Sequence, residues 1–130
     1  MPSYTFDHVH LASPDPEKTA QFYEKMFGAK RLWKRDMNGK ISISVRMEGL
    51  RFSIIQHTGD KKLLPTNVTG VDHLGIITDD LTAAVANLKA NGVVFQTEPF
   101  VFAPGTTICY FWGPDNVLVE LYEVKSPPQK

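Results

Sequence analysis

Apolar and polar positions follow the same succession of patterns twice along this chain of 130 residues. Over about residues 4–12, and again over about residues 70–77, apolar side chains alternate with polar ones as they do in a half-buried β-strand. Each of these segments precedes a stretch with apolar residues at helical spacing, an N-cap aspartate at its start and a glycine at its end. The expected helices run from Asp15 to Gly28 and from Asp80 to Gly92.

Three further strands are expected behind each helix, separated by turn-forming residues such as Asn38-Gly39. They are residues 30–33, 41–47 and 50–56 in the first half, and residues 93–96, 106–112 and 117–122 in the second. The order strand–helix–strand–strand–strand therefore occurs twice. It predicts an α+β fold in which two tandem βαβββ modules form one domain over residues 1–130. The modules cover about residues 4–57 and 70–125, and a polar segment at residues 58–69 links them.

Polar side chains recur at matched places in this repeat. His8 and His73 stand 65 positions apart in the opening strands, and Gln56 and Glu120 stand 64 apart in the closing strands. Because strand side chains alternate between two faces, we expect these four, with His10, on the face away from the helices. If the two sheets join and curl, that face becomes the inside of a cup. Its four matched residues are then candidate ligands for one metal ion.

Charge and composition exclude several classes of partner. Lys plus Arg and Asp plus Glu number 14 each, which argues against nucleic acid or an anionic membrane as a partner. We expect no membrane span and no signal peptide, because no apolar run is long enough and the basic N-terminal pattern is missing. Cys109 is the only cysteine, so no internal disulfide can form, and we expect a buried structural thiol in a cytoplasmic protein.

The paired arrangement resembles the vicinal oxygen chelate superfamily, also called the glyoxalase/bleomycin-resistance/dioxygenase fold, over residues 4–123. The motifs are the His8 strand followed by Phe22-Tyr23, the His73 strand, and Gly113-Pro114-Asp115-Asn116 leading into Val119-Glu120-Leu121. The resemblance implies a curled mixed sheet around a cup-shaped metal site. It implies ligands at His8, Gln56, His73 and Glu120, with Gln56 favoured over its neighbour His57. Such nitrogen and oxygen donors suit one divalent Zn, Ni, Co, Mn or Fe ion.

Three further residues are candidates for work on the substrate. His10 could orient the substrate or move protons as a catalytic residue, or it could be a partly exposed histidine without a role. Arg46 could bind an acidic substrate group or simply face solvent on an edge strand. Tyr110 could form the pocket wall or pack in the core.

The reaction that the resemblance favours is that of a glyoxalase-type, metal-dependent lyase or isomerase. Such an enzyme transfers a proton next to a metal-bound carbonyl of a small oxygenated substrate, with Glu120 as the base. Two families fit in part. In lactoylglutathione lyases an arginine for the glutathione carboxylate would fall at Ala12, and in methylmalonyl-CoA epimerases a second acid would fall at Ser42 or Ser44.

Two alternatives remain open. An extradiol ring-cleaving dioxygenase would use His8, His73 and Glu120 around Fe(II), and Tyr110 lies ten residues before Glu120 as in that family's signature. The signature's upstream histidine is missing. The other alternative is a metal-free protein of the bleomycin-resistance type that binds a small molecule or drug. In every case we expect a small-molecule ligand and a homodimer, in which the site is either intramolecular or shared across the interface.

Overall fold

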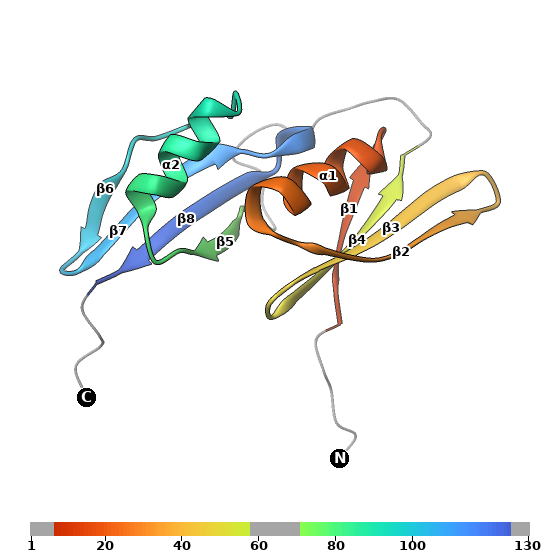
Figure 1. Ribbon diagram of the computed structural model, residues 1–130, viewed down its shortest axis with the longest axis horizontal. Coiled ribbons are helices and arrows are strands. Elements are labelled where there is room, and N and C mark those ends of the chain that lie inside the picture. The colour runs from red at the N-terminus through yellow and green to blue at the C-terminus, as the bar shows by residue number, and fades with distance from the viewer. Residues whose placement is uncertain (1–6, 58–70, 126–130) are drawn as a thin grey trace, which may run out of the picture. The chain divides into compact units, whose positions relative to one another are not determined.

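The computed structural model describes residues 7–57 and 71–125, which belong to two compact units, within residues 1–62 and 63–130. Each unit repeats one order of elements, as predicted (Figure 1). The first holds β1 (Val9–Ser13), α1 (Pro16–Phe27), β2 (Lys30–Met37), β3 (Lys40–Met47) and β4 (Leu50–Gln56). The second holds β5 (Leu74–Ile77), α2 (Leu81–Ala90), β6 (Phe100–Ala103), β7 (Thr106–Trp112), the short 3₁₀ turn η1 (Pro114–Asn116) and β8 (Leu118–Val124). The expected linker at residues 58–69 lies outside the described residues.

Each unit is built on a four-stranded mixed sheet. The strand orders are β1-β4-β3-β2 and β5-β8-β7-β6, with the first strand parallel to the last and the other pairs antiparallel. Each helix lies across one face of its own sheet (Figure 1). The α+β fold is therefore confirmed. It takes the form of two four-stranded sheets that are not closed, and neither described helix is long and apolar enough to cross a membrane.

The helices begin where the sequence predicts. The side chains of Asp15 and Asp80 accept hydrogen bonds from the backbone N–H groups of Lys18 (3.1 Å) and Ala83 (3.0 Å). These bonds satisfy N–H groups that have no partner within the first turn of a helix. At the other end of α1, Gly28 has a φ of 66°, the left-handed conformation that glycine adopts without strain.

Alternation along the strands gives each sheet an apolar face that packs in the core of its unit. In the first unit Tyr23 of α1 packs against Phe52 of β4, with ring centroids 5.0 Å apart. The core of the first unit contains Ala20, Tyr23, Ile43, Val45, Phe52 and Ile54. The core of the second contains Leu81, Val85, Leu88, Cys109, Phe111, Val119 and Leu121. The opposite face of the first sheet carries Ser42, Ser44 and Ser53, whereas that of the second is mixed, with Glu120 among Ile108, Tyr110 and Trp112.

Cys109 is buried, as the sequence predicts. Its side chain is 0% exposed within β7. Burial, with smaller contributions from nearby charges, raises the pKa of its thiol to about 11. The thiol is therefore protonated at neutral pH and shielded from reagents in the folded chain.

One strand prediction is wrong. Residues 93–96 form no regular strand, and only Phe95 makes a single bridge, to Phe111. The backbone N–H groups of Gln96 and Thr97 both donate to the carbonyl of Tyr110, so the chain turns away from the sheet there. The edge strand is instead β6, three residues further on, which pairs with β7.

Candidate functional site

The second unit brings one predicted pair of ligands together. His73 lies immediately before β5 and Glu120 lies in β8, the strand beside it. His73 Nε2 is 3.7 Å from Glu120 Oε1. Gly75 is the register partner of Glu120, and a Cβ added at Gly75 would lie 3.6 Å from the same oxygen. The Glu120 carboxylate therefore lies next to β5, in van der Waals contact with the position of a Cβ at residue 75.

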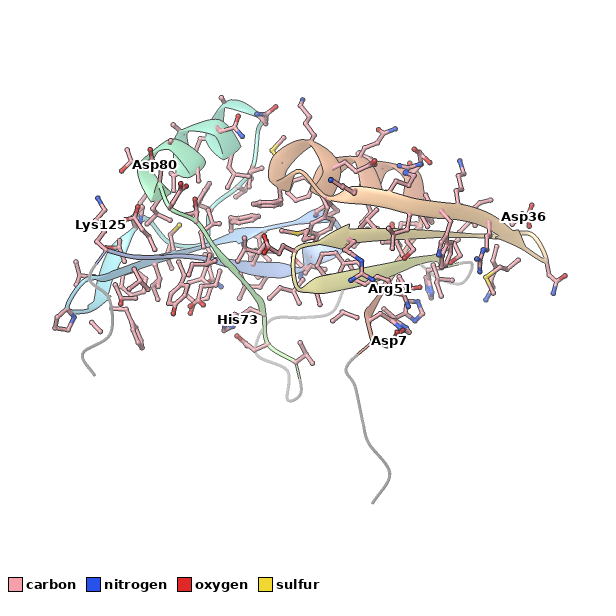
Figure 2. The ribbon with its side chains drawn as sticks, turned by 60° about the horizontal axis from the view of Figure 1, so that its bottom comes forward. Asp7, Asp36, Arg51, His73, Asp80 and Lys125 are labelled. Carbon is pink, nitrogen blue, oxygen red and sulfur yellow. The ribbon has the colours of Figure 1, made fainter. Side chains whose placement is uncertain are left out.

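The neighbouring aspartate determines which nitrogen His73 presents. Asp72 Oδ2 is 2.8 Å from His73 Nδ1. A carboxylate can only accept a hydrogen bond, so Nδ1 carries a proton, and Nε2 is the nitrogen that faces Glu120. A carboxylate that holds the far nitrogen of a histidine is the usual support for a metal ligand. Figure 2 shows His73 at the start of its strand.

Tyr110 completes this group. Its hydroxyl donates to Glu120 Oε2 over 2.8 Å, and its ring meets the His73 ring edge-on with centroids 5.3 Å apart. The bond to the carboxylate, helped by burial, raises the pKa of Tyr110 to about 12. The phenol therefore stays a neutral donor, and it occupies one Glu120 oxygen while the other faces His73.

The first unit holds its histidine in the same way and adds a cation. Asp7 Oδ2 accepts from His8 Nδ1 at 2.6 Å and from Arg51 Nη2, also at 2.6 Å; Figure 2 shows Asp7 and Arg51 side by side. Arg51 Nη1 also donates to Ser44 Oγ, at 2.9 Å. The bond from His8, then the guanidinium, lowers the pKa of Asp7. Nε2 of His8 is again the nitrogen left for a ligand.

The register of the sheets corrects the matching of Gln56 with Glu120. Glu120 pairs with Gly75, two positions after His73, and the residue two positions after His8 is His10, which pairs with Ser53. Ser53 is thus the counterpart of Glu120, and Gln56 is the counterpart of Glu123. The prediction that Gln56 and Glu120 occupy equivalent positions is wrong.

Gln56 lies on the helix-covered face, as alternation from Phe52 requires. Its Oε1 accepts from the backbone N–H of Ile41 at 3.1 Å, and its side chain lines an open pocket of about 400 Å³ at the start of α1. Its counterpart Glu123 accepts from the N–H of Leu81, at the start of α2, over 3.0 Å. Both side chains therefore lie near the first turn of the helix in their own unit. His8 lies outside the pocket that Gln56 lines.

His10 and Arg46 lie on the predicted face. His10 alternates with Val9 and Leu11 of β1, and its exposed side chain projects on the side of Ser53. Arg46 is exposed in β3, on the face that carries Ser44. Their proposed roles on a substrate are taken up below.

Three participants were not foreseen from the sequence: the aspartates Asp7 and Asp72, and Arg51. The aspartates could have been predicted from the Asp-His dipeptide that is repeated at the start of both units. Arg51 had none, because its contact with Asp7 joins residues 44 positions apart.

No group of three His, Cys, Asp or Glu side chains able to hold a metal forms within residues 7–57 and 71–125. The second unit supplies a pair of donors, His73 and Glu120, and the first supplies His8. Imidazole nitrogens and a carboxylate oxygen are donors chemically suited to a divalent first-row metal.

The chain belongs to the Glyoxalase/Bleomycin resistance protein/Dioxygenase superfamily, whose family model matches residues 5–121. It is 30% identical over 129 residues to lactoylglutathione lyase GLX1 of Arabidopsis thaliana, covering 95% of this chain and 46% of the relative. It is 27% identical to the mitochondrial methylmalonyl-CoA epimerase of Dictyostelium discoideum, covering 90% of this chain and 76% of the relative. The chain thus spans about half the length of the plant protein.

Solved structures confirm the fold. A glyoxalase family protein from Bacillus cereus superposes with a TM-score of 0.83 at 16% identity, covering 97% of both chains. A fosfomycin resistance protein from Listeria monocytogenes, solved with Mn(II) and sulfate, gives a TM-score of 0.72 at 23% identity, covering 95% of this chain and 93% of that one.

Proposed function

We propose that this chain is a metal-dependent lyase or isomerase domain that transfers a proton at the carbon next to a carbonyl of a small oxygenated substrate. The observation that carries the proposal is the paired Asp-His arrangement. Asp7 and Asp72 hold Nδ1 of His8 and His73, and each leaves Nε2 ready for an ion. Two histidines prepared in the same way, one with a carboxylate at 3.7 Å, suit a metal site better than two unrelated surface residues.

The donors in this proposal are His8, His73 and Glu120, which together hold one divalent ion of Zn, Ni, Co, Mn or Fe. When bound, the ion would polarise a substrate carbonyl and make the neighbouring C–H bond more acidic. Glu120 is the only anionic member of the set, so the centre keeps a net positive charge that attracts substrate oxygens. Gln56 is left out because its Oε1 accepts from the backbone of Ile41 in β3 and its side chain lines the pocket at the start of α1.

Glu120 is also the group that we propose to take the substrate proton. Its Oε1 faces His73, and its Oε2 is held by the Tyr110 hydroxyl at 2.8 Å. Tyr110 therefore positions the carboxylate, which must lie within hydrogen-bond reach of the proton it abstracts. The side chain of Glu120 is 19% exposed, so a substrate can approach it.

Arg46 is our candidate for binding an acidic group of the substrate. Its exposed guanidinium lies on the polar face of the first sheet, and a guanidinium binds a carboxylate or phosphate through two parallel hydrogen bonds. The same proposal includes a homodimer, in which the donors of the two units come either from one chain or from two.

Metal content tests the donor set. Protein without a histidine tag should bind about one divalent ion per chain. His73→Ala and Glu120→Ala should each lose it, and Gln56→Ala, the matched control in β4, should keep it. A wild-type chain that takes up no ion on reconstitution, yet binds a small molecule tightly, would identify a metal-free binding protein and contradict the proposal.

Solvent exchange tests the reaction. In D₂O, the loaded protein should introduce deuterium next to the carbonyl of a 2-oxoaldehyde–thiol adduct or a related 2-oxo compound, as followed by proton NMR. Glu120→Gln keeps the oxygen donor but cannot accept the proton, so exchange should fall at least about 100-fold, the lower end for a general base. Full exchange by Glu120→Gln would rule out Glu120 as the base.

A second candidate, an Fe(II)-dependent ring-cleaving dioxygenase, is favoured by one observation. Ser53 stands where the first unit would carry a counterpart of Glu120, which leaves two histidines and one carboxylate among the donors. That set is typical of non-haem iron oxygenases with open positions. Oxygen uptake with a catechol, dependent on Fe(II), would favour this candidate over proton transfer.

A further inference from the structure

The two units distribute side chains differently across one pair of neighbouring strands. In the second unit the pair is Gly75 of β5 with Glu120 of β8. In the first unit the equivalent pair is His10 of β1 with Ser53 of β4. A side chain able to bind a metal therefore stands on the last strand of the second unit (Glu120) but on the first strand of the first unit (His10). The second unit has a donor on its last strand opposite glycine, and the first has a donor on its first strand opposite serine.

The two side chains start from opposite strands of equivalent register pairs. The Glu120 carboxylate lies beside β5, with Oε1 3.6 Å from the position of a Cβ at Gly75, which is van der Waals contact. Equivalent register therefore places the Cβ of His10 next to the position that a carboxylate at residue 53 would take. Ser53 is too short to reach that place. Among the described residues the His10 imidazole has no hydrogen-bond or ionic partner, and it is exposed to solvent.

We propose that His10 is a further metal donor, which takes the place that a carboxylate at position 53 would have. This inference rests on the proposed function, since it assumes that His8 binds an ion. Residues two apart on a strand share one face, with Cα atoms roughly 6.6 Å apart. Two imidazoles can converge from that spacing on one ion at Zn–N distances of about 2.0–2.1 Å. Each unit then contributes two donors: His8 and His10, and His73 and Glu120.

The substitution has a consequence for the choice of metal. Three imidazoles and one carboxylate favour Zn, Ni or Fe, whereas a site richer in carboxylates favours Mn. The double variant His10→Gly/Ser53→Glu transfers the arrangement of the second unit into the first. We expect it to bind an ion again and to shift the preference from Zn toward Mn.

Zn²⁺ affinity, measured by competition with a chromophoric chelator, tests the inference without any assay of activity. Loss of a residue that only orients a ligand weakens metal binding roughly 10–100-fold, so His10→Ala should weaken it at least about tenfold. Gln56→Ala should not change it. In the ¹⁵N NMR spectrum of the Zn-loaded wild type, one ring nitrogen of His10 should shift together with those of His8 and His73.

The possible outcomes distinguish failure of the role of His10 from failure of the proposed metal site. No Zn²⁺ binding by the wild type would overturn both. Binding that His73→Ala abolishes and His10→Ala leaves unchanged, with unshifted His10 nitrogens, would overturn the role of His10 alone. Weakened binding in His10→Ala, recovered in His10→Gly/Ser53→Glu, would establish the exchange of donors and exclude a folding defect as the cause.

Discussion

At the scale of single residues, the Asp-His dipeptides fix the orientation of both histidine rings. A histidine free to rotate presents either nitrogen, and binding must select one of them. Asp7 and Asp72 make that selection in the folded chain, so less conformational freedom is lost when a ligand binds. Arg51 extends this support by holding Asp7 against β4.

Tyr110 gives a prediction at this scale. Tyr110→Phe removes the hydrogen bond to Glu120 Oε2 while leaving the ring that meets His73. A hydrogen bond to a charged group contributes about 1.5–3 kcal/mol, so kcat should fall roughly tenfold or more. We expect KM to change little, since the phenol positions the carboxylate without binding the substrate, and metal affinity to fall roughly 10–100-fold, since the phenol orients the donor Glu120. Steady-state kinetics at saturating metal would show the fall in kcat without a change in KM.

Tyr122→Phe is the matched control, because Tyr122 lies on the same face of β8 as Glu120 and is exposed. Equal kinetic effects of the two substitutions, or a rise in KM alone for Tyr110→Phe, would contradict the positioning role.

The sequence allows the residues at the start of each unit to be predicted more safely than those at its end. His8 and His73 are matched correctly, because little chain precedes either of them within its unit. Glu120 follows Ser53 by 67 positions, not 64, since β3 and β4 join through two residues and β7 and β8 through five. Turn length changes the count without changing the pairing, so Gln56 was matched by residue type with the wrong partner.

At the scale of elements, a charged network joins α1 to β2. Arg31 in β2 binds Glu17 at 2.9 Å and Glu24 at 2.7 Å, both in α1, and Lys34 Nζ lies 3.1 Å from Glu17. Hydrogen bonds from Arg31 and then Lys34 lower the pKa of Glu17 from 4.5 to about 2. The ionised carboxylate is thus favoured in the folded state, and it links the helix to an edge strand.

The pH dependence of stability follows from this shift. A carboxyl group with a lowered folded-state pKa stabilises the fold above its unfolded pKa, and this contribution disappears as the pH falls from about 4.5 to about 2. Glu17→Gln should lower the free energy of unfolding at pH 7 by less than about 1 kcal/mol, because the pair is partly exposed. Near pH 2 the two proteins should be equally stable.

Urea unfolding at both pH values measures this difference, with Glu48→Gln, at an exposed turn, as the control. A difference between Glu17→Gln and the wild type that persists unchanged at pH 2 would show that Glu17 acts through packing and not through its charge.

The elements themselves were largely predictable from capping residues and alternation, and β6 shows where such patterns fail. Residues 93–96 alternate as a strand does, but their backbone partners on β7 form only one bridge. The real edge strand, β6, carries exposed Phe100, Val101 and Phe102. Three consecutive apolar residues show no period of two, so the alternation of apolar and polar positions gives no sign of this strand.

At the scale of the whole molecule, neither unit carries a complete set of donors. The first unit contributes His8, with His10 in our inference, and the second contributes His73 and Glu120. The proposed function therefore requires both kinds of unit to be folded before the ion binds. Metal binding should stabilise both units together, because a ligand that binds only the folded state adds to its stability.

The position of the single thiol allows the units to be followed separately. Cys109 is buried in the second unit, and the chain has no other cysteine. Native protein should therefore react with a thiol reagent at least about 100-fold more slowly than protein in urea, since exposure requires opening of that unit. The urea dependence of the labelling rate then measures cooperativity. A slope equal to that of the circular dichroism transition would mean that the chain opens as one body. A slope about half as large would mean that the second unit opens alone, because slope scales with the surface exposed.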